Sequence, residues 1–489
     1  MNILQNYING EFVSSYSKES IDVIDPSTNQ TRALVPKGCT QDVNQAIIAA
    51  SAASSEWRKT PPNERAQYLY KLKTLLEEHT DELILLCTLE SGKTLSESKA
   101  EMTRAIENVE VACGIPILLQ SEYSQDIARG IDEYMVRTPV GIAACIAPFN
   151  FPLMIPFWFI PYAIACGNTY IVKPSEKVPS SMQKIFELIN KLGLPPGVIN
   201  MVHGGKTAVD EILERPEIKA ISFVGSTPIA KYVYSKASAA GKRVQAQGGA
   251  KNPIVVMPDA DMEATSKIIA DSAFGCAGQR CLAAANIILV GSAKDTFIPK
   301  INEIAKSKTV GAGSESCNQM GAIITKESKE RISSLIDQAV QEGAAILVDG
   351  RTDLNQEQSR GNFIKPTILN NIDPEGEVFR TEIFGPVMSI LSTPDLKSAI
   401  DIINKSEYGN SACIFTDSGR AARDFQYNVE AGNVGVNIGV AAPMAFFPFS
   451  GHKASFFGDL HGQGRHSIEF FTQTKVVIER WPETWSRQF

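Results

Sequence analysis

The sequence predicts an α/β protein built on parallel sheets that are covered by helices. From residue 141 onward, short apolar segments of strand length alternate with segments of helical periodicity. Such alternation is typical of parallel sheets, because each parallel strand needs a crossover connection to the next. The chain has 489 residues, of which 44% are hydrophobic and 21% charged. This length exceeds one core and favours a globular protein of two or three domains.

The N-terminal part predicts a hairpin followed by helices. Asn9-Gly10 lies between two short apolar runs, as in a two-residue hairpin turn. After Thr40, which we expect to be an N-cap, apolar residues recur at helical spacing. Further helices are expected up to about residue 116.

Four apolar runs predict the strands of a first, doubly wound sheet of the Rossmann type. They are GIAACIAP at 141–148, NTYIVKP at 168–174, VINMVHG at 198–204 and AISFVGS at 220–226. The apolar stretch 141–166 contains several prolines, so we interpret it as a buried strand, a turn and a helix rather than a membrane span.

A second α/β pattern runs from about Lys251 to residue 435, with ANIILVG and PVMSILS as strands. The segments 123–140 and 469–481 resemble short strands with no core of their own. Edge strands of that kind often pair with another subunit.

Composition excludes several classes of function. The net charge of −7 gives no reason to expect nucleic acid or an anionic membrane as a partner. The nine cysteines are scattered without a CxxC pair, which indicates reduced thiols in a cytosolic or matrix-like compartment. No histidine or cysteine cluster has metal-ligand spacing, and no secretory signal is visible, so we expect no metal and a cytoplasmic protein.

The most specific local feature is FGCAGQRC at 274–281, where small residues precede Cys281. Small residues let a backbone approach a ligand closely, and a thiolate is a competent nucleophile. A single cysteine among nine is nevertheless more often a core residue. IAPFNFP at 146–152 places Asn150 in a turn after a strand, where its amide either caps the turn or donates to an oxyanion, a contribution of about 3 kcal/mol.

Two further strand ends carry groups that suit a dinucleotide. VKPSE at 172–176 contains Lys173 and Glu176, which either contact a dinucleotide or form a surface ion pair. FVGSTPIA at 223–230 contains Gly225. Taken together and in this order, these four elements resemble the aldehyde dehydrogenase superfamily. EIFGPV at 382–387, NVGVN at 433–437 and PFSGHK at 448–453 extend the resemblance over essentially the whole chain.

The resemblance implies a domain organisation. Residues 1–120 and 141–246 would form a Rossmann-type NAD-binding domain, and 247–435 an α/β catalytic domain. Residues 121–140 and 467–489 would supply a small β oligomerisation element, which implies a homodimer or homotetramer. Residues 436–466 would return to the NAD-binding domain.

The same resemblance implies the chemistry. Cys281 would attack an aldehyde to give a thiohemiacetal, and Asn150 with the Cys281 backbone N–H would hold the oxyanion. Hydride would then pass to NAD and leave a thioester. Lys173 and Glu176 would hold the adenosine ribose, and their carboxylate favours NAD over NADP. The remaining cofactor residues would be Ala147, Phe149, Lys177, Gly225, Ser226, Gly248, Glu382 and Phe384. Ala230 departs from the family pattern, which often has glycine there, so we expect the helix beside the pyrophosphate to pack differently.

A larger departure lies at QGGAKNP, 247–253. Hydrolytic members of the superfamily begin this segment with the glutamate that activates water, whereas this chain has Gln247, and an amide is no base near neutral pH. A thiol acceptor avoids that difficulty, so coenzyme A is expected as co-substrate. The GAKN core and PMAFFPFSGHKASFFGDLHGQG at 443–464 resemble the methylmalonate-semialdehyde dehydrogenases, a CoA-acylating branch.

That branch implies a substrate with a carboxylate, which Arg104 and Arg280 would bind. Arg104 could equally brace its helix, and Arg280 could tune the nucleophile's loop. The expected reaction converts methylmalonate semialdehyde to propionyl-CoA, and malonate semialdehyde to acetyl-CoA, with release of CO₂. The alternatives are a hydrolytic aldehyde dehydrogenase that uses another base such as Glu382, and a non-catalytic binding protein.

Overall fold

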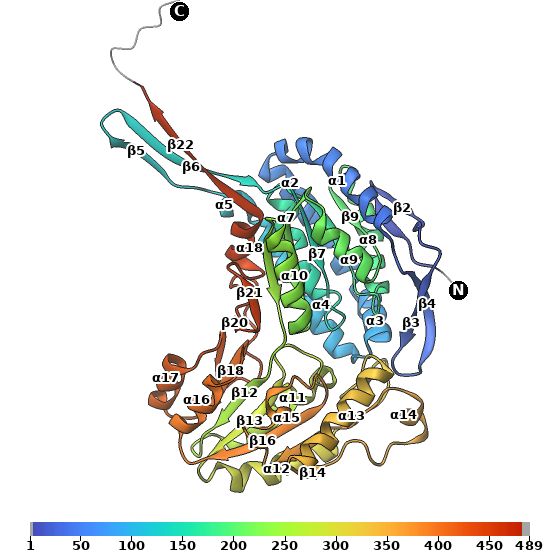
Figure 1. Cartoon of the computed structure of the whole chain (residues 1–489), viewed down its shortest axis with the longest axis vertical. Coiled ribbons are helices and arrows are strands. Elements are labelled where there is room, and N and C mark those ends of the chain that lie inside the picture. Colours follow the sequence, from blue (N-terminus) through green and yellow to red (C-terminus); the bar gives the residue numbers. More distant parts are fainter. Residues whose placement is uncertain (1–2, 482–489) are drawn as a thin grey trace, which may run out of the picture.

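The structure is a computed structural model that describes residues 3–481. Figure 1 shows two α/β lobes, with a three-stranded arm that projects from the lobe containing the N-terminal half. The last part of the predicted oligomerisation segment, residues 482–489, lies outside the described residues. None of the helices within residues 3–481 combines the length and apolar character that a membrane span requires.

The first lobe contains an eight-stranded sheet in the order β2-β1-β9-β8-β7-β10-β11-β21. Its five central strands, from β9 to β11, run parallel, and all four predicted strands are confirmed. The strands are β1 (Asn6–Ile8), β2 (Glu11–Val13), β7 (Ile142–Ile146), β8 (Thr169–Lys173), β9 (Ile199–Met201), β10 (Ile218–Val224), β11 (Arg243–Gln247) and β21 (Phe456–Gly458).

Both faces of this sheet are buried, and side chains point alternately to one face and the other along each strand. Ala143 and Cys145 of β7 enter one hydrophobic cluster, while Ile142 and Ile146 enter the cluster on the other face. The helices of this lobe are α1 (Thr40–Lys59), α2 (Pro62–Glu78), α3 (Thr80–Ser91), α4 (Leu95–Cys113), α5 (Ile115–Leu118), α6 (Met154–Phe157), α7 (Ile160–Ala165), α8 (Ser180–Asn190), α9 (Lys206–Glu214), α10 (Thr227–Ala239) and α18 (Gly464–Phe471).

Local sequence signals in the N-terminal part are mostly confirmed. Asn9 and Gly10 form the turn between β1 and β2 with φ of 55° and 84°, the left-handed conformation that a two-residue hairpin requires. The prediction of Thr40 as N-cap is wrong by one residue, because α1 begins at Thr40 and Cys39 is its N-cap. The Asp42 carboxylate supplies the cap by accepting the Cys39 backbone N–H at 3.0 Å.

The second lobe contains a seven-stranded sheet in the order β14-β15-β16-β13-β12-β18-β19, parallel except for β14. Its strands are β12 (Asn252–Val256), β13 (Ala284–Val290), β14 (Ala345–Val348), β15 (Thr367–Asn370), β16 (Val387–Thr393), β18 (Ser411–Phe415) and β19 (Asn433–Val436). Its helices are α11 (Met262–Phe274), the 3₁₀ turn η1 (Gly275–Gly278), α12 (Ala293–Ser307), α13 (Lys326–Gln341), α14 (Gln356–Arg360), α15 (Glu377–Arg380), α16 (Leu396–Asn404) and α17 (Gly419–Asn428).

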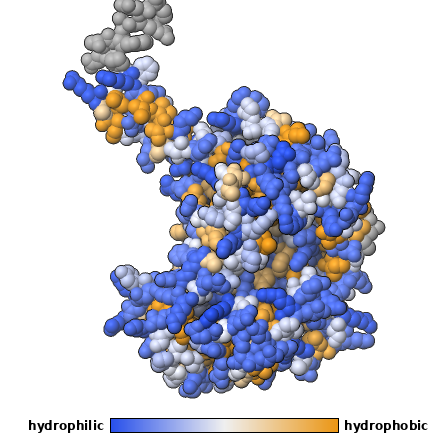
Figure 2. All heavy atoms as spheres, viewed as in Figure 1, coloured by the Kyte–Doolittle hydropathy of each residue, from blue (hydrophilic) through white to orange (hydrophobic). Residues whose placement is uncertain are grey.

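The arm is an antiparallel sheet in the order β22-β6-β5. Figure 2 shows apolar side chains gathered on it, and Val476 and Ile478 are 57% and 65% exposed. Its strands are β5 (Tyr123–Ala128), β6 (Ile131–Pro139) and β22 (Thr472–Arg480). Two-stranded pairs join β3 (Ser20–Asp25) to β4 (Gln30–Pro36) and β17 (Tyr408–Gly409) to β20 (His452–Lys453).

Candidate active site

Four of the predicted motifs meet because their strands are neighbours that end at the same edge of the first sheet. In the order β8-β7-β10-β11, Lys173 pairs with Ile146, Ile146 with Phe223, and Val224 with Gln247. The segments that follow these residues therefore emerge side by side at the carboxyl ends of parallel strands. That edge is where doubly wound sheets bind their ligands.

The loop before Cys281 has an unusual backbone. Cys276, Ala277 and Gly278 have φ of 51°, 52° and 69°, and each non-glycine residue in this left-handed region costs roughly 1–2 kcal/mol. A Cβ on Gly278 would lie 2.0 Å from the carbonyl oxygen of Gly385, so only glycine fits against the EIFGPV segment. The Gln279 side chain holds the loop, since its Oε1 accepts the Ile324 N–H at 3.0 Å.

Cys281 is fixed through its own backbone and lies partly exposed. Its carbonyl oxygen accepts the amide N–H groups of Asn252 and Asn410, each at 2.8 Å. Desolvation, together with the negative charge of Glu382, raises the pKa of the Cys281 thiol to about 12, while the backbone N–H groups of Cys281 and Leu282 act to lower it. In the protein without cofactor, the Cys281 thiol is therefore protonated at neutral pH.

This pKa predicts how the reactivity of Cys281 depends on pH in the absence of cofactor. Alkylation requires the thiolate, so its rate should rise about tenfold per pH unit from about pH 7 to about pH 10. The measurement is iodoacetamide labelling with mass spectrometry of the Cys281 peptide, which separates it from the exposed Cys317. A rate that levels off below about pH 9 would contradict the prediction, because a pKa near 12 leaves the thiolate a minor species throughout that range.

Asn150 lies against the nucleophile's loop. Its side chain is 7% exposed, and its Nδ2 donates to the Gln279 carbonyl oxygen at 3.2 Å, two residues before Cys281. An asparagine amide has two donor hydrogens, so one remains for a ligand oxygen. Turn and loop are thus connected directly, as an oxyanion site shared between them requires.

Groups suited to a dinucleotide line up from β8 toward the second lobe. Lys173 Nζ lies 2.9 Å from Glu176 Oε2, so both groups predicted to hold a ribose are together at the end of β8. Lys177 Nζ lies 5.2 Å from the centroid of the Phe149 ring, which meets the Phe384 ring edge to face at 5.8 Å. Phe149 and Phe384 come from different lobes, so this contact bridges them.

Glu382 is an acid whose negative charge raises the pKa of Cys281. Its Oε1 accepts the Ala250 N–H at 2.9 Å, and burial raises the pKa of its carboxyl to about 7. A Cβ on Gly249 would lie 2.4 Å from Glu382 Oε2, so the glycine is required for this approach. The Arg331 guanidinium donates to the carbonyl oxygens of Glu382 and Ile383 at 2.7 and 2.8 Å and thereby fixes the segment.

The predicted pyrophosphate groups lie at the start of α10. Ser226 is the N-cap of this helix, and Gly225 donates its N–H to the Gln247 carbonyl oxygen at 3.0 Å. Gly248 is also sterically required, because a Cβ there would lie 2.7 Å from the Ala454 carbonyl oxygen. Ala230, at the position where the family often has glycine, lies in the first turn of α10 and is fully buried. Ala147, the remaining predicted cofactor residue, is 8% exposed directly after β7.

A cavity of about 180 Å³ lies in front of Cys281, and both predicted substrate arginines line it. Arg104 Nη1 donates to Glu107 Oε2 at 2.8 Å and also contacts the Met444 sulfur. Arg280 is folded back, and its Nη2 donates to the Asp271 carbonyl oxygen at 2.8 Å. The rest of the wall is mainly apolar: Phe151, Met154, Trp158, Leu282, Val440, Ala442, Pro443 and Phe449.

Gln247 lies at the end of β11 and is 6% exposed. Its amide nitrogen has no hydrogen-bond partner among the described residues. A Cβ on Gly462 would lie 3.2 Å from that nitrogen and 3.5 Å from the ring of Trp158, which lines the cavity. The distinctive segment 443–464 therefore packs against the position where the hydrolytic pattern has glutamate.

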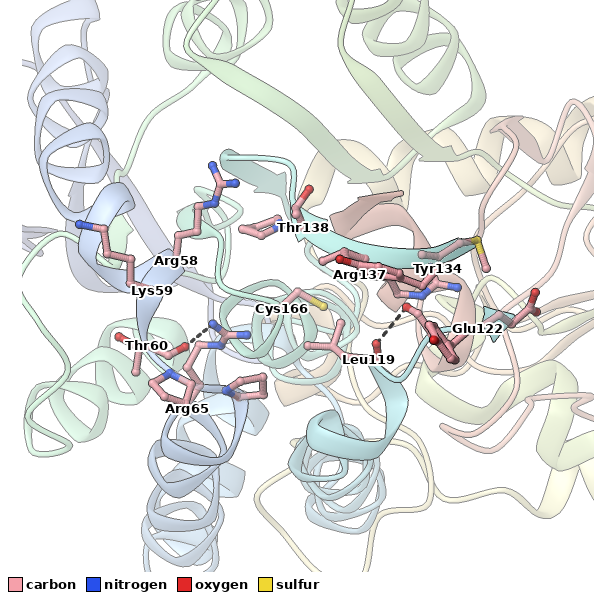
Figure 3. Close-up of a pocket in the computed structure, with 17 residues that line it drawn as sticks. Arg58, Lys59, Thr60, Arg65, Leu119, Glu122, Tyr134, Arg137, Thr138 and Cys166 are labelled. Carbon is pink, nitrogen blue, oxygen red and sulfur yellow. Dashed lines mark hydrogen bonds between the residues drawn. The ribbon is translucent and has the colours of Figure 1, made fainter. Parts of the chain in front are cut away.

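A larger cavity, of about 700 Å³, lies at the base of the arm and not beside Cys281. Figure 3 shows Arg58, Arg65 and Arg137 around it, with Cys166 between them. It contains none of the predicted catalytic or cofactor residues. Burial raises the pKa of the Cys166 thiol to about 12, which leaves it an inert core group.

Several residues that build the site were not predicted from the sequence. Asn252 and Asn410 hold the Cys281 carbonyl, and Arg331 holds the Glu382 segment. Glu97 and Glu101 of α4 contact the two loops of the site. Of these residues, Asn252 was the easiest to predict from the sequence, because it belongs to the QGGAKNP motif.

Comparisons with known proteins concern the chain as a whole. The family model described as "Aldehyde dehydrogenase family" matches residues 12–477. Malonate-semialdehyde dehydrogenase 3 of Geobacillus kaustophilus is 46% identical over 98% of this chain and 99% of its own length. The crystal structure of methylmalonate-semialdehyde dehydrogenase from Oceanimonas doudoroffii superposes with a TM-score of 0.97, at 43% identity over 99% of both chains.

A more distant solved structure, the NAD⁺ complex of an aldehyde dehydrogenase from Bacillus cereus, is 29% identical. It has a TM-score of 0.93 over 98% of this chain and 97% of its own. A family match over nearly the whole length, together with relatives above 40% identity, leaves one conclusion: the chain belongs to the aldehyde dehydrogenase family.

Proposed function

We propose that this enzyme oxidises malonate semialdehyde and methylmalonate semialdehyde with NAD and transfers the acyl group from Cys281 to coenzyme A. The products would be acetyl-CoA or propionyl-CoA, with loss of CO₂. The names of the relatives support the semialdehyde substrates. The observation that carries the CoA step is Gln247, because it leaves a neutral amide where hydrolytic members have their base.

The first half of the reaction would use the residues of the two loops. The Cys281 sulfur forms a bond to the aldehyde carbon, and the carbonyl oxygen gains negative charge. The second hydrogen of the Asn150 amide and the Cys281 backbone N–H would donate to that oxygen. The aldehyde carbon then loses a hydride and remains bound to sulfur as a thioester.

The residues along the cleft fit NAD, which when bound accepts the hydride. A Cβ at 248 would meet the Ala454 carbonyl oxygen and one at 249 the Glu382 carboxylate, so glycine at these positions lets the backbone lie close to Glu382. The Lys173–Glu176 pair suits a ribose diol, and Glu176 disfavours a 2′-phosphate. Glu382 would hold the second ribose through its free carboxylate oxygen, and Phe384 would pack against the ring beside it.

The substrate's carboxylate would lie near Arg104 at the apolar cavity. Arg104 is the better placed of the two predicted arginines, because Arg280 directs its guanidinium to the backbone of Asp271 and Gly275. Arg104 already pairs with Glu107, so a substrate carboxylate would compete with that acid or share the guanidinium with it.

The second half of the reaction would consume the thioester. Coenzyme A brings a thiol, which ionises more readily than water and attacks the thioester carbon without a strong base. The Cys281 sulfur then leaves as thiolate, and acyl-CoA forms. At the thioester stage the bond to the substrate's carboxylate breaks as CO₂ leaves, its electron pair forms the thioester enolate, and a proton from water converts this enolate to the acetyl or propionyl group. One observation favours the hydrolytic alternative. The carboxyl of Glu382 has a pKa of about 7 and its charge raises the pKa of Cys281, so Glu382 could serve as a base for water at this site.

Omitting coenzyme A tests the proposal. NADH formation should stop after about one equivalent per subunit, because the thioester on Cys281 persists, and it should resume when CoA is added. The Gln247→Glu variant is the matched comparison, and it should turn over steadily without CoA. Continuous NADH formation by the unaltered enzyme without CoA would instead support Glu382 as the base.

We also propose that the arm joins subunits into a homodimer or homotetramer. Its sheet has two strands at its edges, β22 and β5, with exposed apolar residues on them. Unpaired edges with apolar faces favour association with another chain. The exposed large side chains are Tyr123, Ile127, Val136, Val476 and Ile478.

A further inference from the structure

One face of α4 borders both halves of the active site. Glu97, Glu101 and Arg104 are spaced four and three residues apart, which places them on the same side of the helix. All three line the cavity in front of Cys281. Arg104 is proposed to bind the substrate's carboxylate. The two acids instead contact backbone N–H groups of the two loops that carry Asn150 and Cys281.

Glu101 holds the segment that follows Asn150. It is 2% exposed, and its Oε1 accepts the backbone N–H groups of Leu153 and Met154 at 2.8 and 3.0 Å. Its other oxygen pairs with Lys93, which is also buried. Burial alone would lower the pKa of Lys93, but the nearby Glu101 carboxylate raises it above its usual value, so Lys93 keeps its charge.

Lys93 extends this contact to the residue next to Asn150. Its Nζ lies 4.2 Å from the centroid of the Phe151 ring, within the range of a cation–π interaction. Phe151, Leu153 and Met154 are therefore all held by one buried ion pair. The turn that carries Asn150 is fixed from its C-terminal side.

Glu97 holds the other half of the site. Its Oε1 accepts the backbone N–H of Cys276, the first left-handed residue of the nucleophile's loop. Its Oε2 accepts the Thr94 N–H at 2.9 Å, which closes the capping box of α4. The strained turn before Cys281 is thus anchored to the N-terminus of the same helix that anchors the Asn150 turn.

From these contacts we infer that Glu97 and Glu101 are positioning residues that align Cys281 with its oxyanion donor Asn150. The inference rests on the proposed roles of those two residues. Hydrogen bonds from N–H groups to carboxylates are about twice as strong as neutral ones. Glu101 is buried and has few alternative partners, and both oxygens of the partly buried Glu97 already accept backbone N–H groups. Because a misplacement of about 1 Å can cost 10²-fold in rate, a common anchor on one rigid helix directly affects thioester formation.

The test measures the first turnover, which precedes any step that needs coenzyme A. Glu97→Ala removes both acceptor oxygens, and Glu97→Gln keeps one of them. Lys93→Met combined with Glu101→Gln removes both buried charges together and keeps an acceptor for Leu153 and Met154, so no unpaired charge is left to prevent folding. Glu110→Ala is the control, an exposed acid on the same helix that pairs with Lys73 at the surface.

The rate of the NADH burst should fall about 10- to 100-fold in Glu97→Ala. It should fall by a smaller factor in the double variant, which keeps an acceptor for Leu153 and Met154 but loses the ion pair and the contact of Lys93 with Phe151. Glu97→Gln should recover part of the loss, and Glu110→Ala should stay within about twofold of the unaltered enzyme. The KM for NAD and the amount of Cys281 that iodoacetamide labels should remain unchanged, since the cofactor site and the folded fraction are unaffected.

Two results would overturn the inference. One is a burst rate within about twofold of the unaltered enzyme in both Glu97→Ala and the double variant. The other is a slower burst that falls in proportion to the labelled Cys281, which would indicate a smaller folded fraction. A failure of the CoA proposal is distinguishable, because it appears as steady NADH formation after the first turnover and leaves the first-turnover rate measurable.

Discussion

Cys281→Ser should lower steady-state NADH formation from the semialdehyde by on the order of 10⁴-fold, the largest effect expected for any single substitution in this chain. The thiol is already disfavoured as an anion here, with a pKa near 12. A serine hydroxyl in the same place is far less acidic, and an ester would replace the reactive thioester. The substitution changes one atom, so the fold and the NAD cleft should be retained.

The matched control for this variant is Cys317→Ser, which changes an exposed thiol outside the site. The Cys317→Ser protein should retain full activity. Intact-mass measurement should detect an acyl adduct on the Cys317→Ser protein and none on the Cys281→Ser protein. Residual activity of Cys281→Ser above about 1% would exclude Cys281 as the nucleophile, because an effect of that size is typical of residues that only support catalysis.

Asn150→Ala should lower kcat by about 10²- to 10³-fold, the cost of removing one oxyanion donor. The donor acts on charge that develops in the transition state, so KM for the semialdehyde should change much less than kcat. The measurement is the rate of the first NADH burst together with steady-state kcat and KM.

A second consequence of Asn150→Ala has to be separated from the first. The Asn150 amide also donates to the Gln279 carbonyl, and leaving that buried acceptor unpaired costs about 1–3 kcal/mol of stability. Thermal unfolding of the variant measures this part. A kcat within about tenfold of the unaltered enzyme would show that Asn150 braces the loop and does not stabilise the oxyanion.

The arrangement of the site follows from the sequence where strand order determines it. Asn150, Lys173 and Gly225 lie at or just after the ends of three predicted strands, and parallel strands place such residues at one edge. Gln247 ends β11, a strand that was not predicted, and it reaches the same edge because β11 runs parallel to β10. The strand boundaries were predictable because each run is apolar and bounded by turn residues. The special role of Cys281 depended on the resemblance to a known family, since its loop belongs to the other lobe.

The supporting residues could not be predicted in the same way. Glu97, Glu101 and Arg331 lie on helices, where charged residues normally indicate a solvated face. Their partners are backbone groups from about 50 to 180 positions away in the chain. No local pattern encodes such a contact, because any backbone N–H or C=O is an equivalent partner.

Arg280 illustrates the same difficulty at a residue beside the nucleophile. Its position next to Cys281 favoured a substrate contact, but its guanidinium donates to backbone carbonyls of the preceding turn. Gly275 makes this possible, since a Cβ there would overlap the Arg280 guanidinium. The direction of a long side chain depends on the space left by such neighbours, which the sequence alone does not reveal.

The central claim is that Cys281 gives its acyl group to coenzyme A and not to water. The most direct measurement is mass spectrometry of the products formed from methylmalonate semialdehyde and NAD in ¹⁸O-labelled water, with and without coenzyme A. Propionyl-CoA should form with coenzyme A, and without it an acyl adduct should remain on the Cys281 peptide. Many equivalents of ¹⁸O-labelled free acid without coenzyme A would contradict the account.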